Sequence, residues 1–155
     1  MATLCISVGN PLRGDDGVAH RVLDLLGTAI TASFLRVQQL TPEISEIIAR
    51  ARNVVIIDAD VNATTPHVEP IARQSLSGSG LSHAMNPAEV VGLAAQLYGF
   101  TGAAFVCHVP GFVFGPGNPL SAGAETNALK AAQIIQDLCA NFSIGQTALS
   151  AVKWS

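Results

Sequence analysis

Three side chains of this sequence could act together in a chemical reaction: the carboxylates of Asp16 and Asp58 and the imidazole of His83. They stand at positions that a fold can bring together. Asp16 and Asp58 each follow a predicted strand, and His83 precedes a predicted helix. In a parallel α/β sheet, the loops after the strands share one edge, and ligands bind there. We therefore expect the three side chains to converge. Such a set suits a transition-metal ion such as nickel or zinc, or alternatively acid–base work.

Asp16 belongs to a Gly-rich turn, Gly9–Val18 (GNPLRGDDGV), which directly follows the apolar run 4–8. The turn opens a helix predicted over 15–26, so the adjacent Asp15 and Asp16 fall in its first turn, where the helix dipole favours carboxylates. An acidic pair has the wrong charge for a phosphate. The turn also has neither the Gly-Lys-Ser/Thr of a P-loop nor the GxGxxG spacing. It is predicted to hold a cation or a proton.

Each of these residues also has a structural interpretation. One Asp of the pair can cap the helix, Asp58 can bond backbone amides where its strand ends, and His83 can be a surface or capping residue. Two adjacent Asp residues weaken the capping interpretation, because one suffices as a cap. The remaining histidines are expected to be structural: His20, His67 and His108.

Short β-rich runs alternate with helical periodicity along the chain, which predicts a mostly parallel sheet covered by helices. Strands are expected at 4–8, 34–38, 54–57, 68–71 (an edge strand) and 103–109. Helices are expected at 15–26, 41–50 (with Thr41 as N-cap), 86–97 and 122–140. The run 54–57 (VVII) is typical of a central strand buried on both faces. The segment 141–155 has no clear pattern and is treated as a tail of uncertain structure.

The composition limits the classes of partner. A chain of 155 residues without linkers or repeats is expected to be a single domain over 1–155. Its hydrophobic fraction is 49% and its charged fraction only 12%, so some exposed surface must be apolar, which favours a protein partner or self-association. The net charge of −3 and the scattered Lys and Arg residues argue against nucleic-acid binding.

The cysteines and the apolar runs bear on the compartment. Cys5, Cys107 and Cys139 are far apart without CxxC spacing, so reduced thiols are expected. The first apolar run has no basic segment before it and is interrupted at Asn10-Pro11, which indicates a strand and not a signal peptide. The longest apolar stretches fall short of the roughly 18–20 residues that span a bilayer. A cytoplasmic protein without membrane insertion is predicted.

The sequence resembles the maturation endopeptidases of nickel–iron hydrogenases. The specific motif is GNPLRGDDGV; VVIIDAD, LSHAMNPAEVVGLAAQLYG, QLTPE and GFVFGPGNPLS support it, so the resemblance reaches to about Ala140. It implies a three-layer α/β/α fold. It also implies that the acidic residue of the first loop, the Asp after the third strand and the His before a later helix form the catalytic and metal-contacting site. In this chain these are Asp16, Asp58 and His83.

The resemblance implies an aspartyl-type endopeptidase that removes the C-terminal extension of a hydrogenase large-subunit precursor after nickel insertion. The nickel would come from the substrate, and no permanently bound cofactor is expected. Two alternatives remain: a nickel-site assembly checkpoint or chaperone that does not cleave, and a metal-dependent peptidase of broader specificity. No GxSxG elbow is present and no serine or cysteine nucleophile is evident, so a water nucleophile, activated by the metal or by a carboxylate, is expected.

Two positions depart from the family pattern. Many relatives have Glu where this chain has Asp16, which shortens the arm that reaches the metal. Some also have an acidic residue after the second strand, where this chain has Gln39. Asp15 and Asp60 are the nearest acidic substitutes in the sequence.

Overall fold

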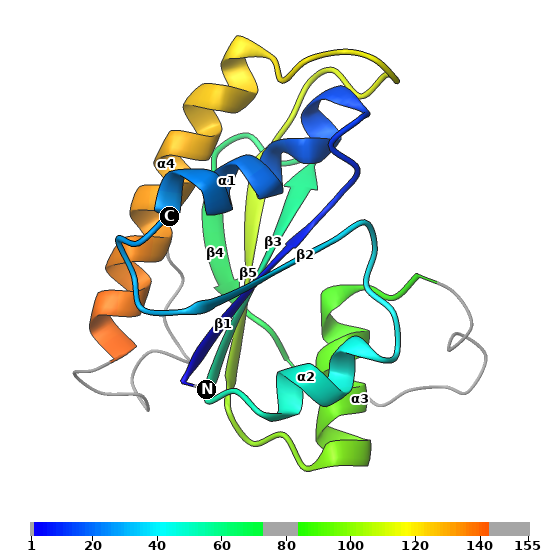
Figure 1. Cartoon of the computed structure of the whole chain (residues 1–155), viewed down its shortest axis with the longest axis vertical. Helices are drawn as coiled ribbons and strands as arrows, with labels where there is room; N and C mark the ends of the chain where they lie inside the picture. The colour runs from blue at the N-terminus through cyan, green and yellow to red at the C-terminus, as the bar shows by residue number, and fades with distance from the viewer. Residues whose placement is uncertain (1, 73–83, 143–155) are drawn as a thin grey trace.

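The computed structural model describes residues 2–72 and 84–142. The predicted site residue His83, and all of the uncertain tail beyond Phe142, lie outside the described residues. The described chain forms one five-stranded sheet of order β2-β1-β3-β5-β4, in which β4 alone is antiparallel to its neighbour (Figure 1). The strands are β1 (Thr3–Val8), β2 (Ser33–Val37), β3 (Asn53–Asp60), β4 (His67–Pro70) and β5 (Ala103–Pro110).

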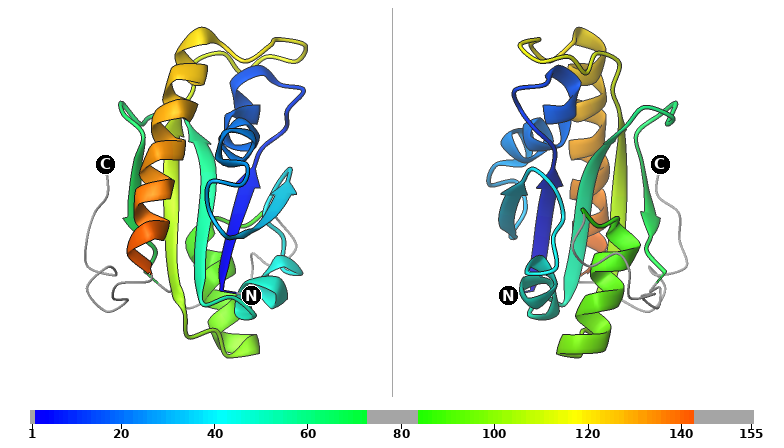
Figure 2. Two further views of the ribbon diagram at one scale, coloured as in Figure 1. Left: turned by 60° about the vertical axis from the view of Figure 1, so that its left-hand side comes forward. Right: turned by 90° about the vertical axis from the view of Figure 1, so that its right-hand side faces the viewer.

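Helices cover both faces of the sheet. One face carries α1 and α4, which pack on each other, and the other carries α2 and α3 (Figure 2). The helical elements are the 3₁₀ turn η1 (Gly14–Gly17), α1 (Val18–Leu26), α2 (Ile44–Ala49), α3 (Pro87–Tyr98) and α4 (Ala122–Phe142). The predicted three-layer α/β/α architecture with a mostly parallel sheet is confirmed.

The central strand β3 divides its side chains between two cores. Val55 and Ile57 pack with α1 and α4, whereas Val54 and Ile56 pack with α2 and α3, and all four are fully buried. This alternation is the period of two that a strand imposes on its side chains. Burial on both faces explains why the run is continuously aliphatic, as the sequence predicted. The frame that carries Asp58 is therefore rigid.

The structure corrects the predicted end of this strand. β3 continues to Asp60, so Asp58 lies within the strand and not in the loop after it. The extension follows from parallel pairing with β5, which joins Asp58 to His108 and Asp60 to Pro110. Backbone pairing keeps these polar residues in the sheet although their side chains give no hydrophobic signal.

Two helix starts also differ from the prediction. The helix predicted from Asp15 begins at Val18, because Gly14–Gly17 form a tighter 3₁₀ turn before it. The Asp15 N–H of this turn donates to the Val113 carbonyl, in the loop after β5, at 2.7 Å. The second helix begins at Ile44, and Thr41 is not its N-cap. Ile44 N–H instead donates to the Thr41 carbonyl at 3.1 Å in a turn before the helix.

Several other expectations are confirmed. The helix expected at 86–97 is α3, which Asn86 caps through a reciprocal capping box with Glu89 and in which Pro87 is the first helical residue. β4 is an edge strand, and the three cysteines are free thiols. None of the helices in the described part of the chain is both long and apolar enough to cross a membrane.

Candidate active site

The turn after β1 brings Asp16 back against the strand end. Gly9 has φ +145°, and a Cβ atom there would lie 1.8 Å from the Asp16 carbonyl oxygen and 3.6 Å from its carboxyl carbon. Only glycine permits this approach. The turn is closed by Asn10 N–H, which donates to Asp16 Oδ2 at 2.7 Å. Gly9 thus allows the close approach that places the Asp16 carboxylate at the end of β1.

Asp58 reaches the same place from the neighbouring strand. It pairs in register with Val8, the residue before Gly9, and on its other side with His108. Because side chains alternate along a strand, Asp58 is on the same sheet face as Ile56, which is the face that α3 covers. Both carboxylates thus belong to the carboxyl edge of the sheet, at the ends of the adjacent strands β1 and β3.

The environment of Asp58 raises the pKa of its carboxyl group above the ordinary value. Burial raises its pKa most, and the negative charges of Asp16 and Asp60 raise it further against a lowering by the Ala59 backbone amide. The result is a pKa of about 6, compared with an ordinary value of 3.8. The carboxylate of Asp16 is therefore near enough for its charge to act on Asp58. A carboxylate with such a pKa is well suited to accept a proton near neutral pH.

His20 supports the turn from beneath. Its Nε2 donates to the Gly9 carbonyl at 2.6 Å, because a carbonyl can only accept. In the neutral ring, Nδ1 is then the acceptor for the Ser7 hydroxyl, also at 2.6 Å. The expectation of a structural role for His20 is confirmed.

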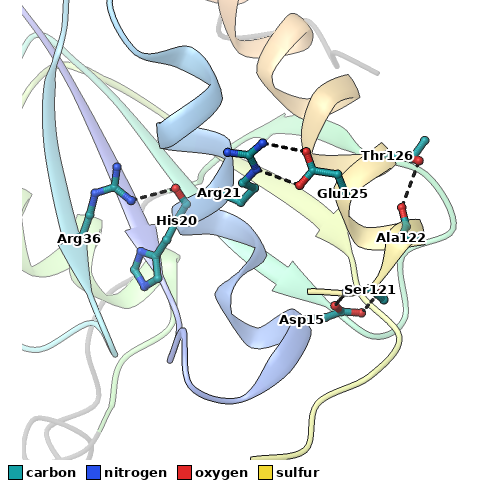
Figure 3. Close-up of polar contacts among 8 residues, drawn as sticks. All are labelled: Asp15, His20, Arg21, Arg36, Ser121, Ala122, Glu125 and Thr126. Carbon is teal, nitrogen blue, oxygen red and sulfur yellow. Dashed lines mark hydrogen bonds and ion pairs between the residues drawn. The ribbon is translucent and has the colours of Figure 1, made fainter. Parts of the chain in front are cut away.

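Asp15 has a different task from its neighbour Asp16. Its side chain is fully buried and accepts hydrogen bonds of 2.7–3.0 Å from the backbone amides of Phe112, Val113 and Ser121 and from the Ser121 hydroxyl. Figure 3 shows Asp15 beside Ser121. Burial alone would raise its pKa, but the bonds from Ser121, Val113 and Phe112 outweigh it and hold the pKa below the ordinary value of 3.8. Asp15 ties the first loop to the loop between β5 and α4.

Neither aspartate of the pair caps α1, so the capping interpretation is wrong. The sequence also missed Ser121, the main partner of Asp15, which lies 106 residues away. Its position directly before α4 is the available signal, because its hydroxyl accepts from Ala124 N–H at 3.1 Å as a helix cap does.

Asp15 and Asp60 are the acidic residues that the sequence offers in place of the carboxylate absent at Gln39. The four bonds to Asp15 occupy its carboxylate away from the candidate site. Asp60 accepts from Asn62 N–H at 2.8 Å and lies 3.2 Å from His108 Nδ1. The oxygens of Asp60 are thus paired with Asn62 and His108, although its charge still acts on Asp58.

An ion pair joins the two helices on one side of the site. Arg21 of α1 donates to both oxygens of Glu125 of α4, at 2.8 and 3.0 Å (Figure 3). Both side chains are more than a third exposed, so the pair adds little stability, on the order of 1 kcal/mol or less. The larger constraint on these two segments is the buried bonding of Asp15.

The third predicted site residue, His83, lies outside the described residues, so its place relative to Asp16 and Asp58 is untested. The described chain resumes at Ala84. Met85 N–H donates to the Leu40 carbonyl at 3.0 Å, which fixes the start of this segment beside the residues that follow β2.

Comparison with known proteins identifies the fold. No protein-family model matches the sequence, and no curated protein matches it significantly. The structure resembles the hydrogenase maturation protease HycI from Thermococcus kodakarensis (TM-score 0.67, 17% identity, 90% of this chain and 93% of that chain). It also resembles the hydrogenase maturating endopeptidase HybD from E. coli (TM-score 0.63, 20% identity, 94% of each chain). An endopeptidase from E. coli gives a TM-score of 0.70 at 18% identity over 94% of this chain and 95% of that chain.

The chain has the fold of the hydrogenase maturation proteases. At these identities the likeness establishes the architecture, which agrees with the one that the sequence resemblance implied.

Asp15→Asn is expected to destabilise the protein by about 2–4 kcal/mol, because an amide NH₂ group would face backbone N–H donors in a buried site. Asp24→Asn, which removes only an exposed partner of Arg36, is the control and should cost less than about 1 kcal/mol. Denaturant unfolding at pH 7 measures both. Because the folded-state pKa of Asp15 is lowered, its contribution is present above about pH 4 and is lost as the pH falls further. Equal losses in the two variants would contradict this role.

Asp58→Asn is expected to stabilise the chelator-treated protein at pH 8 by on the order of 2 kcal/mol. Because the pKa of Asp58 is higher in the folded protein than in the unfolded chain, the folded state binds its proton more tightly. The folded state therefore loses stability as the pH rises from about 4 through about 6 and Asp58 ionises. The asparagine does not ionise and escapes that loss. Unfolding curves at pH 8 and pH 4.5 should show a difference that shrinks at the lower pH. A destabilised variant at pH 8 would mean that the carboxylate makes stabilising contacts.

Proposed function

We propose that this protein is an endopeptidase that removes the C-terminal extension of a nickel–iron hydrogenase large-subunit precursor after nickel insertion. The observation that carries the proposal is the convergence of Asp16 and Asp58 at the carboxyl edge of a sheet with the fold of known hydrogenase maturation proteases. The names of HycI and HybD, two of these structural neighbours, assign them to hydrogenase maturation. The location we propose is the cytoplasm.

In this proposal nickel is part of the substrate. Asp16, Asp58 and His83 supply two carboxylates and an imidazole to a nickel ion that the precursor already holds, so that only a loaded precursor docks fully. Asp16 is held at the strand end by Asn10 N–H, and Asp58 by the buried strand β3. Rigid support of this kind is what a metal-contacting carboxylate requires.

We also assign Asp58 as the general base, acting through the carboxylate oxygen that does not contact the nickel. A pKa of about 6 leaves it mostly ionised at neutral pH yet much more basic than an ordinary aspartate. It can accept a proton from the water that attacks the scissile carbonyl and return that proton to the leaving amine. The neighbouring charge of Asp16 contributes to this basicity.

Exposed apolar side chains beside the site supply a surface for the precursor. Leu12 is 74% exposed and Phe112 is 62% exposed. They belong to the two loops that Asp15 joins, and Gly117 N–H adds a further bond to the Leu12 carbonyl at 3.0 Å. We assign these side chains to contact with the precursor next to the cleavage point.

Asp58→Asn is expected to lower processing of nickel-loaded precursor at least about a hundredfold while the protein stays folded. The amide keeps the size and hydrogen-bonding capacity of the side chain and removes its charge. Mass spectrometry of loaded and nickel-free precursor after incubation measures cleavage, with Asp24→Asn as the folded control.

Near-normal processing by folded Asp58→Asn would remove Asp58 from the mechanism. Wild-type protein that binds loaded precursor but leaves its mass unchanged would favour a checkpoint without protease activity. Cleavage of small peptides without any nickel-loaded partner would favour a broader peptidase.

Leu12→Ser is expected to raise the KM for the precursor about tenfold with little change in kcat, because it removes an exposed contact and leaves the carboxylates in place. Leu97→Ser is the matched control: Leu97 is 64% exposed but lies in the last turn of α3, away from the two loops. Steady-state processing assays on both variants give the comparison. An equal effect of the two substitutions would show that the loop surface is not the docking site.

A further inference from the structure

A second group of potential metal ligands lies on β4 and β5. These two strands lie side by side at one edge of the sheet (Figure 1). His67 and His108 are register partners across the antiparallel pair, and Glu69 is two residues after His67 on the same face of β4. One ligand atom from each of these residues lies within 4.8 Å of the others. Among the described residues, this is the one group of three or more His, Cys, Asp or Glu side chains whose ligand atoms lie that close together.

The two imidazoles are oriented by oxygen atoms on their Nδ1 sides. His67 Nδ1 donates to the Thr65 carbonyl at 3.0 Å, and His108 Nδ1 lies 3.2 Å from Asp60 Oδ2. These contacts place the proton of each neutral ring on Nδ1. The lone pair of each ring is then on Nε2. Carbonyl and carboxylate partners of this kind orient metal-ligating histidines in proteins and fix their tautomer.

Both Nε2 atoms face the same carboxylate. His67 Nε2 is 3.5 Å from Glu69 Oε1, and His108 Nε2 is 3.8 Å from Glu69 Oε2. These separations are long for hydrogen bonds. They are close to the spacing of about 3.4 Å between two ligands that each lie about 2.0–2.1 Å from one tetrahedral ion. The rings are stacked with centroids 4.8 Å apart, which keeps the two nitrogens on one side.

We propose that His67, Glu69 and His108 bind a divalent transition-metal ion of the zinc class, with Asp60 and the Thr65 carbonyl orienting the two imidazoles. Two neutral imidazoles and one carboxylate form a ligand set that zinc and nickel accept, and it leaves room for water or another ligand. The side chains of the two histidines are 20% and 26% exposed, so an ion can enter from solvent.

This site is separate from the one proposed for cleavage. It uses neither Asp16 nor Asp58, and it does not depend on the protein being a protease. It revises the expectation that His67 and His108 are only structural. It also departs from the expectation that the chain binds no resident metal. An ion here would join edge strand β4 to β5 and should therefore raise the thermal stability of the protein.

The test is calorimetric titration of tag-free, chelator-treated full-length protein with Zn²⁺ and, separately, Ni²⁺. The protein used is Asp16→Asn, which weakens the candidate cleavage site and leaves β4 and β5 unchanged. One ion per chain is expected, together with a rise in melting temperature. Into this background, His67→Asn and Glu69→Gln are each expected to weaken binding at least about tenfold.

Glu46→Gln is the matched control for Glu69→Gln, because Glu46 is an exposed carboxylate on α2 that pairs with Arg50. It should leave binding unchanged. Because His67 is on an edge strand, its variant is expected to fold, and circular dichroism checks this. Binding of Co²⁺ with visible bands typical of nitrogen and oxygen ligands would support the site. Absence of binding of both Zn²⁺ and Ni²⁺, or unchanged affinity in His67→Asn, would overturn it and leave an ion-pair cluster.

Discussion

The buried carboxylate of Asp15 is the constraint on which the geometry of the candidate site depends. An ionised group with no exposure to solvent is costly unless it is fully hydrogen-bonded, and here four donors from residues 112–121 meet it. Each hydrogen bond to a charged group contributes on the order of 1.5–3 kcal/mol. Because Asp16 is the next residue, the same bonds that fix Asp15 also limit where Asp16 can lie.

The three aspartates divide the electrostatic work. Asp15 is surrounded by donors, which lower its pKa, whereas Asp58 is buried beside Asp16 and Asp60, which raise its pKa to about 6. The first arrangement stabilises the fold at neutral pH, and the second lowers its stability there. A carboxylate kept in an unfavourable environment by a rigid strand is characteristic of functional sites. This contrast between chemically identical side chains supports assigning chemistry to Asp58 and structure to Asp15.

Local signals in the sequence predicted the sheet and both helical layers, and they placed Asp16 and Asp58 at the ends of two strands that prove to be neighbours. The aliphatic run 54–57 required burial on both faces, and Asn86-Pro87 carried its own capping chemistry. The role of Asp15 could not be predicted, because its partners lie 97–106 residues away along the chain. For the same reason the cluster of His67 with His108 was missed: strand register across an antiparallel pair determines it. The position of His83 remains a prediction.

The direction of β4 explains why a second polar cluster lies so near the first. Parallel strands bring only their carboxyl ends to the site edge, so β3 and β5 contribute Asp58, Asp60 and His108 there. β4 is antiparallel, and its first residue, His67, therefore lies at that same edge. Asp58, His108 and His67 consequently form a row across three adjacent strands. Asp60 is common to both groups, since its charge raises the pKa of Asp58 while its oxygen orients His108. The sheet edge thus carries two polar clusters, one facing the Gly-rich turn and one facing the edge strand.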